Sequence, residues 1–202
     1  IWETLEVDNS FNQSSFLMAK ILPTIYERVS TMGTASIWKL LMLSWSYENG
    51  LAVPEKGEKR SFTGGLSRIL KVGYSKDIVK LDYASLYPSI MITHGVYPEC
   101  DVSGAMHAML QYLYDTRNKY KYKANECTAK GDKKMASFFK AKQLPIKIIN
   151  NSMYGSLTAP QVFNWGDVMK GEEVTCTARM YLRLLVRFFE NRGFIPLVLD
   201  TD

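Results

Sequence analysis

Apolar residues recur every three to five positions through much of the chain, which is the spacing that places side chains on one face of an α-helix. In the first part of the sequence the pattern includes Phe16, Leu22 and Tyr26, and it resumes after Gly33. The spacing predicts mainly helical structure over 1–31, Ser36–Tyr47, about 105–124, about 133–154 and 172–192. Apolar stripes of this kind usually face a core, and we assign no chemistry to the first two.

Two short apolar runs fit strands better than helices, because each is brief and bounded by turn residues. The first is Ile78–Leu81 and ends at Asp82; the second is Phe194–Leu199 and ends at Asp200–Asp202. An ionised carboxylate at the end of a buried strand must be paired, or must bind a cation, to offset its lost hydration. Asp82 is therefore a candidate metal ligand, although capping of a turn or helix explains many such residues.

Two breaks in the apolar pattern divide the chain. Asn49-Gly50 and the charged run Pro54–Arg60 mark a solvated loop, which is the best candidate boundary. Gly131-Asp132 separates the third and fourth expected helices, so these two are expected to form an αα-hairpin. Pro145 lies inside the second helix of that pair and should kink it or weaken one turn, because proline has no N–H to donate.

The overall composition is that of an ordinary globular chain: 202 residues, 47% of them hydrophobic, with a formal net charge of +5. No run of about 18 apolar residues occurs, so no transmembrane helix is expected, and the start lacks the basic and apolar segments of a secretory signal. We therefore expect an intracellular protein, cytoplasmic in a prokaryote or phage-infected cell and nuclear in a eukaryote. The chain does not begin with Met, and we take it as a fragment.

The cysteines and histidines exclude two kinds of site. Cys100, Cys127 and Cys176 lie too far apart for a Cys-x-x-Cys metal site, and their odd number suits no disulfide framework. His94 and His107 are the only histidines, which leaves a zinc site without ligands. Any metal ion must then be held by oxygen, which favours Mg²⁺ or Mn²⁺.

The positive charge is concentrated in one part of the chain. From Arg117 to Lys147 the sequence contains ten basic and two acidic residues, a net charge of +8, which leaves −3 for the rest. A basic block beside isolated acidic sites suits an enzyme that acts on a polyanion. A solvated helical hairpin that binds nothing would have the same charge.

Three segments combine fixed residue types at fixed spacing: Asp82–Ser89, Lys147–Gly155 and Asp200–Asp202. They read Asp-Tyr-Ala-Ser-Leu-Tyr-Pro-Ser, Lys-Ile-Ile-Asn-Asn-Ser-Met-Tyr-Gly and Asp-Thr-Asp. In this order they resemble motifs A, B and C of the family B DNA polymerases, except that Val198 stands where motif C usually has an aromatic residue. Upstream, Phe62–Gly65 resembles the Tyr-x-Gly-Gly/Ala element of the family, with phenylalanine in place of the tyrosine.

The resemblance implies an α+β fold, the palm of a right-hand polymerase, whose antiparallel sheet would carry Asp82 and Asp202. A two-helix fingers hairpin would be added to this palm, while the exonuclease and thumb would be absent, so the fragment alone is expected to hold duplex DNA poorly. The implied divisions are a helical region preceding the palm at 1–50, palm with the Gly-Gly element and motif A at 51–104, fingers with motif B at 105–155, and palm helix and strand ending in motif C at 156–202.

By the same resemblance, the reaction is template-directed transfer of deoxynucleotides from dNTPs to a primer 3′-hydroxyl, with release of pyrophosphate, in DNA replication. Two Mg²⁺ ions, which Mn²⁺ can replace, would be held by Asp82 and Asp202. The backbone carbonyl of Tyr83 would be a further ligand, and Asp200 would lie in the outer shell. Lys147 would be the general acid toward pyrophosphate, which makes Asp82, Asp202 and Lys147 the implied catalytic residues.

The resemblance also implies which residues bind the substrates. Tyr87 would pack beneath the deoxyribose and block a 2′-hydroxyl, and Ser85 and Leu86 would offer backbone N–H groups to phosphate oxygens. The residues expected to bind nucleotide are Ser85, Leu86, Tyr87, Arg117, Lys121, Lys147 and Asn151. The residues expected to contact DNA are Phe62, Gly64, Gly65, Tyr154 and Gly155.

The implied partners are primer–template DNA and dNTPs, with no membrane partner, and the sequence does not identify replication accessory proteins. Two other interpretations stay open: a different right-hand polymerase of reverse transcriptase-like type, and a non-catalytic nucleic-acid-binding module built on the basic hairpin. Protein priming is not favoured, because only 65 positions separate Asp82 from Lys147.

Overall fold

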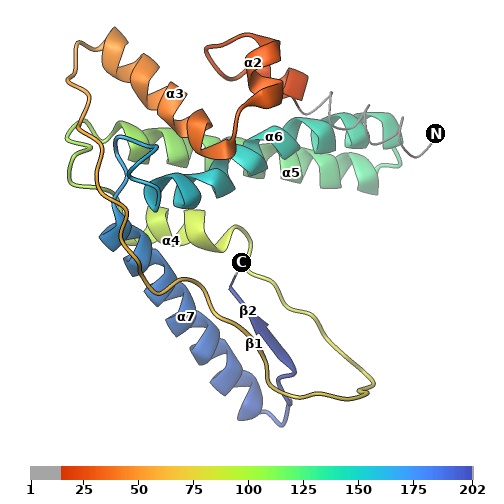
Figure 1. The fold of residues 1–202 in the computed structure, drawn as a ribbon. Helices are drawn as coiled ribbons and strands as arrows, with labels where there is room; N and C mark the ends of the chain where they lie inside the picture. The colour runs from red at the N-terminus through yellow and green to blue at the C-terminus, as the bar shows by residue number, and fades with distance from the viewer. Residues whose placement is uncertain (1–14, 202) are drawn as a thin grey trace.

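The computed structural model describes residues 15–201, so Asp202 and the part of the expected N-terminal helical region at 1–14 lie outside the described residues. The described chain is mostly helical with a small antiparallel sheet (Figure 1). None of its helices is both long enough and apolar enough to span a bilayer. Residues 15–19 are helical, and the elements that follow are α2 (Tyr26–Thr31), α3 (Thr34–Glu48), β1 (Ser67–Ile69), α4 (Leu86–His94), α5 (Ala105–Ala129), α6 (Lys133–Leu157), α7 (Val168–Glu190) and β2 (Val198–Asp200).

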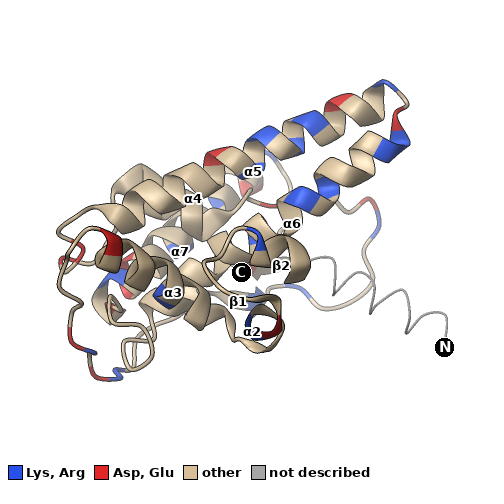
Figure 2. Ribbon diagram, turned by 90° about the horizontal axis from the view of Figure 1, so that it is seen from above, with Lys and Arg blue, Asp and Glu red and all other residues tan. Residues whose placement is uncertain are grey.

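The αα-hairpin expected around Gly131-Asp132 is confirmed. Helices α5 and α6 are each 25 residues long and lie side by side (Figure 1). The connection places Gly131 at φ +77°, in the left-handed region that glycine adopts without strain, and Asp132 caps α6 by accepting a hydrogen bond from the Met135 N–H at 3.0 Å. Helix α6 continues through Pro145, which is buried. Figure 2 shows the Lys and Arg residues gathered along the half of the hairpin nearest its turn.

Helix α3, expected over Ser36–Tyr47, packs on α6 and completes the core. Its apolar stripe is buried at Ile37, Trp38 and Met42. Trp38 is fully buried, and its Nε1–H donates to the backbone carbonyl of Ile149 on α6 at 2.8 Å. A buried indole N–H without an acceptor would lose its hydration uncompensated, so this bond selects how α3 sits on α6.

Helix α4 lies between the hairpin and α7 (Figure 1). Its N-cap residue, Ser85, has φ +53°, which turns the chain sharply before the helix begins. Pro88 lies in the first turn, where a missing N–H costs no bond within the helix. Because Ile90 and Met91 are buried, the segment that follows Asp82 is anchored to the core.

Helix α7 begins at Val168, earlier than the predicted start at residue 172. The reason is Asp167, whose Oδ1 accepts hydrogen bonds from the N–H groups of Met169 at 3.0 Å and Lys170 at 3.1 Å. The N–H of Asp167 itself donates to the carbonyl of Leu157 at 2.7 Å. The cap therefore ties the start of α7 to the end of α6.

Strands β1 and β2 pair antiparallel, with Ser67 opposite Asp200 and Ile69 opposite Val198. The strand expected over Phe194–Leu199 is confirmed only in its last part, since β2 begins at Val198. The pairing brings the Gly-Gly segment, which leads into β1, beside the Asp200-Thr201 end of β2.

The strand predicted over Ile78–Leu81 is wrong. This segment and Asp82 have no regular secondary structure, and Ile78, Val79 and Leu81 are 65%, 69% and 54% exposed. A strand needs a neighbour for its N–H and C=O groups, and within residues 15–201 the two strands pair only with each other. In this structure the sheet therefore does not carry Asp82. The apolar run indicated β structure without indicating which segment would pair with it.

Replacing Trp38 by Phe is expected to lower the free energy of unfolding by about 2 kcal/mol, because it removes the bond to Ile149 and leaves a void in the core. Trp45, on the same helix, is the matched control: it is 37% exposed, and its Phe variant should stay within about 0.5 kcal/mol of the parent. Urea denaturation followed by circular dichroism measures both. Equal losses in the two variants would contradict the role given to Trp38.

Candidate active site

A buried hydroxyl group, that of Thr201, connects segments that are far apart in the sequence. Thr201 is 2% exposed, and its Oγ1 accepts a hydrogen bond from the Leu66 N–H at 2.7 Å. The hydroxyl of Tyr87 donates to the same oxygen at 3.4 Å, and the Thr201 hydroxyl donates to the Leu66 carbonyl at 3.4 Å. The structure thus brings Tyr87 of motif A and Thr201 of motif C together beside the Gly-Gly element.

Gly65 fits this junction because it has no side chain. A Cβ atom at Gly65 would overlap Thr201 Oγ1 and would lie 2.8 Å from the Tyr87 hydroxyl oxygen. At Gly64, by contrast, no atom lies within 4 Å of the position that a Cβ would take. The two neighbouring glycines therefore differ. The lack of a side chain at Gly65 lets the backbone approach Thr201 and Tyr87 closely, whereas Gly64 has room for a side chain.

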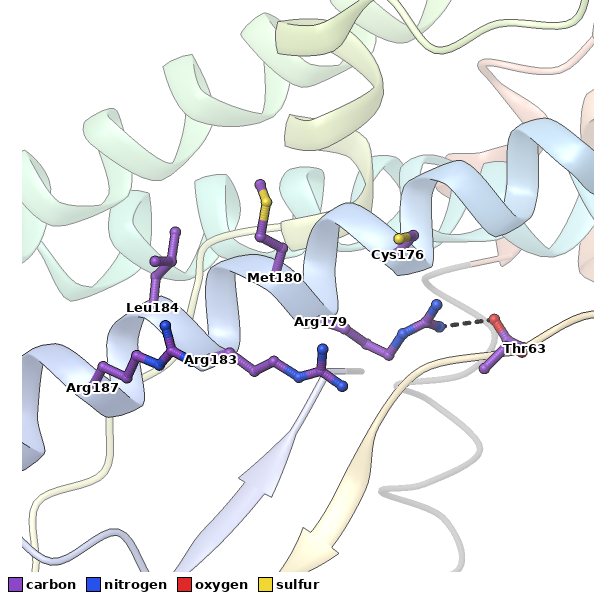
Figure 3. A pocket seen from close by; sticks show the side chains of 7 residues that line it. All are labelled: Thr63, Cys176, Arg179, Met180, Arg183, Leu184 and Arg187. Carbon is purple, nitrogen blue, oxygen red and sulfur yellow. Dashed lines mark hydrogen bonds between the residues drawn. The ribbon is translucent and has the colours of Figure 1, made fainter.

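Helix α7 holds the other end of the Gly-Gly element. Arg179 donates from Nη1 to the carbonyls of Thr63, at 2.9 Å, and Gly64, and Thr175 Oγ1 donates to the Thr63 carbonyl at 3.0 Å. Figure 3 shows Arg183 and Arg187 extending from the same side of α7 as Arg179. This side borders a cavity of about 570 Å³ lined by Thr63, Cys176, Arg179, Met180, Arg183, Leu184 and Arg187.

Motif B meets motif A through two tyrosines. The rings of Tyr87 and Tyr154 have centroids 4.5 Å apart and are tilted by 39°. Burial, and then the neighbouring Tyr87, raise the pKa of Tyr154 to about 12, although Arg179 acts in the opposite direction. The Tyr154 hydroxyl is therefore protonated at neutral pH and can donate a hydrogen bond.

Arg117 on α5 reaches the start of α4. Its Nη1 donates to the Ser85 hydroxyl, while its Nε is buried without a hydrogen-bond partner. Burial is the main cause that lowers the pKa of Arg117. A buried N–H donor that finds no acceptor is costly, so this guanidinium has unused capacity for an oxygen ligand.

Two predicted residues of motif B share one side of α6. Lys147 and Asn151 are exposed and line a hollow of about 390 Å³ together with Thr34, Leu144, Ile148 and Ser152. Within residues 15–201, no hydrogen bond joins Lys147 or Asn151 to Ser85 or Tyr87. Of the remaining predicted residues, Phe62 and Leu86 are half-buried, and Lys121 and Gly155 are exposed.

The described carboxylates of motifs A and C are exposed to solvent. Asp82 is exposed in the irregular segment before α4, Tyr83 is 38% exposed, and Asp200 is exposed at the end of β2. Asp202 lies outside the described residues, and among those described no group of three or more His, Cys, Asp or Glu side chains could hold a metal ion.

No family model matches the chain. Among curated proteins, DNA polymerase 1 of Pyrococcus abyssi is 29% identical over 98% of this chain, and the DNA polymerase of Thermococcus gorgonarius is 28% identical over the same share. Among solved structures, the family B DNA polymerase of Pyrobaculum calidifontis matches 98% of the chain with a TM-score of 0.74 at 21% sequence identity. Over nearly its whole length the chain is thus similar in sequence to archaeal DNA polymerases and in fold to a family B DNA polymerase.

The chain spans 29% of the length of each of those three proteins. The similarity covers nearly all of the chain, so it includes residues 15–33, where the motifs gave no resemblance. The TM-score shows that the chain shares its overall fold with that structure.

Three residues that hold this site together were not predicted from the sequence: Thr201, Arg179 and Thr175. Thr201 stands between the two carboxylates of motif C, and Arg179 and Thr175 lie in the helix expected over 172–192. Periodicity gave a signal for the arginine, since Arg179, Arg183 and Arg187 recur every four residues and must share a face. No local signal pointed to Thr201, whose partners are 114 and 135 residues away.

The two glycines of the Gly-Gly element give a matched pair of variants. Gly65→Ala is expected to lower the free energy of unfolding by about 1–3 kcal/mol, because the added methyl displaces the Thr201 or Tyr87 hydroxyl. Gly64→Ala should remain within about 0.5 kcal/mol of the parent. Urea denaturation compares the three proteins, and equal stability of the two variants would show that the packing around Thr201 is different from that described.

Proposed function

We propose that this chain is the polymerase core of a DNA-directed DNA polymerase, which extends a primer 3′-hydroxyl with deoxynucleotides and releases pyrophosphate in DNA replication. The observation that supports this most is the Thr201 junction, where the ends of motif A and motif C meet through the Tyr87 hydroxyl. The relatedness of the chain to archaeal DNA polymerases supports the same reaction.

In this proposal 51–104 and 156–202 form the palm, 105–155 forms the fingers, and 1–50 precedes the palm. The hairpin of α5 and α6 supports the fingers assignment, because it is a long two-helix unit with most of the basic residues on its outer half (Figure 2). A positively charged surface of this kind attracts nucleotide triphosphates and DNA.

Metal ions would be held by Asp82 and Asp202, with the Tyr83 carbonyl as a further ligand and Asp200 in the outer shell. When bound, two Mg²⁺ ions, or Mn²⁺ in their place, would stabilise negative charge on the attacking and leaving oxygens. The exposed Asp82 and Asp200 carboxylates are compatible with this role, since both are open to solvent and consist of oxygen donors.

The triphosphate would be bound by Arg117, Lys121, Lys147 and Asn151, with Lys147 protonating the departing pyrophosphate. Two features of the structure support this binding. The first turn of α4 offers backbone N–H groups that have no partner within the helix, and the buried Nε of Arg117 lacks an acceptor. The amides of Ser85 and Leu86 and the Arg117 guanidinium would therefore contact phosphate oxygens.

The sugar, base pair and DNA would be recognised by aromatic and small residues. Tyr87 would lie beneath the deoxyribose, and Tyr154, whose ring contacts Tyr87 at a 39° tilt, would lie with Gly155 beneath the nascent base pair. Phe62, Gly64 and Gly65 would contact the template strand.

A non-catalytic nucleic-acid-binding module is the second candidate, and the basic half of the hairpin in Figure 2 favours it. Such a module would bind DNA in a salt-sensitive way that does not depend on Asp82. A reverse transcriptase-like polymerase is a third, and it differs in copying RNA.

Asp82→Asn in the full-length protein is expected to reduce primer extension with Mg²⁺ by about 100-fold or more, because it removes a ligand whose charge is worth several kcal/mol in the transition state. Asp77→Asn is the control: it lies in the same irregular segment, and at its φ of +57° asparagine is well tolerated. Extension by Asp82→Asn at the parent's rate would exclude the proposed role. DNA binding without nucleotide addition in the parent would instead favour the binding module.

A further inference from the structure

We infer that Thr201 is a positioning residue that sets the selectivity for deoxyribose, acting through the hydroxyl of Tyr87. The inference rests on the proposed function, because it concerns how that site distinguishes a deoxynucleotide from a ribonucleotide. It assigns a specific task to the residue between the carboxylates of motif C, which the motif itself does not define.

The hydroxyl group of Thr201 has a full set of hydrogen-bond partners. A hydroxyl group can donate one hydrogen bond and accept two. The Thr201 hydroxyl uses all three: it donates to the Leu66 carbonyl at 3.4 Å, and it accepts from the Leu66 N–H at 2.7 Å and from the Tyr87 hydroxyl at 3.4 Å. Because Thr201 is only 2% exposed, water cannot readily replace a lost partner.

The side chain of Tyr87 is held at both ends. One part of the ring contacts the Tyr154 ring, with centroids 4.5 Å apart, and the hydroxyl end faces Gly65, where even a Cβ atom would lie 2.8 Å away. The hydroxyl therefore has little room to move on one side, and its bond to Thr201 fixes it on the other. A ring held at both ends can exclude a 2′-hydroxyl group by contact, whereas a ring free at one end can yield.

Leu66, to which Thr201 is hydrogen-bonded, lies beside the sheet. Leu66 immediately precedes β1, which pairs with β2, and Thr201 immediately follows β2. The two bonds between the Thr201 side chain and the Leu66 backbone therefore lie directly beyond the last β1–β2 pair. They tie the hydroxyl of Tyr87 to the same short sheet that places Asp200.

Single-nucleotide primer extension with the full-length protein tests the inference, using the ratio of kcat/KM for dATP to that for ATP. Thr201→Val keeps the shape of the side chain and removes the hydroxyl, and it is expected to lower the ratio about three- to tenfold. Tyr87→Phe removes only the donor and should lower the ratio similarly. Thr201→Ser retains the hydroxyl, so its ratio should fall by no more than about twofold.

The double variant Thr201→Val with Tyr87→Phe distinguishes a shared role from two separate ones. If the residues act through one bond, the ratio of the double variant should be no lower than that of the single variant with the lower ratio. Additive losses, or an unchanged ratio in Thr201→Val, would overturn the inference while leaving the proposed function intact. If the parent protein adds no deoxynucleotide at all, the result contradicts the proposed function itself, and with it the inference. Tyr87→Phe leaves the Leu66 bonds intact, so it remains informative even if Thr201→Val folds poorly.

Discussion

The hydrogen bonds of Thr201 are the interaction on which the candidate active site depends. They join motif C to Tyr87 of motif A, 114 positions away, and to Leu66 beside the Gly-Gly element, 135 positions away. Each bond taken singly is weak, but together they satisfy a buried hydroxyl whose exposure to an apolar environment would otherwise be costly. The close approach of Gly65 is a requirement of the same junction, since any side chain there would separate the three segments.

The helices provide the rigid frame around that junction. The α5–α6 hairpin is fixed against α3 through the buried Trp38, and α4 lies between the hairpin and α7. Arg117 reaches across from α5 to Ser85, and Arg179 reaches from α7 to Thr63 and Gly64. Both arginines bind neutral oxygen atoms of the protein, so each serves as a structural donor whose charge is still available to an anion. The Tyr87–Tyr154 contact then links motif B to this frame.

The helical part of the fold could be predicted from the sequence, because apolar periodicity and capping residues are local signals. The hairpin at Gly131-Asp132 and the helix after Gly33 are examples, whereas the cap at Asp167 was missed. The sheet could be predicted only in part. The exposed run Ile78–Leu81 has the composition of a strand, but pairing depends on a distant segment that a local pattern does not specify. For the same reason Thr201 and Arg179, whose partners are all remote, were not predicted, whereas the motifs made Tyr87, Lys147 and Asn151 candidates, a prediction that the structure does not test.

We propose that Asp82 and Asp202, from two distant segments, form one oxygen-donor site for divalent cations. Titration with Mn²⁺ in the full-length protein, monitored by electron paramagnetic resonance of the free ion, measures that site directly. Loss of an outer-shell partner typically weakens metal binding about 10–100-fold, so Asp82→Asn and Asp202→Asn should each weaken Mn²⁺ binding at least that much. Asp115→Asn, an exposed position on α5, should bind as the parent does. Parent-like Mn²⁺ affinity in Asp82→Asn would contradict the claim.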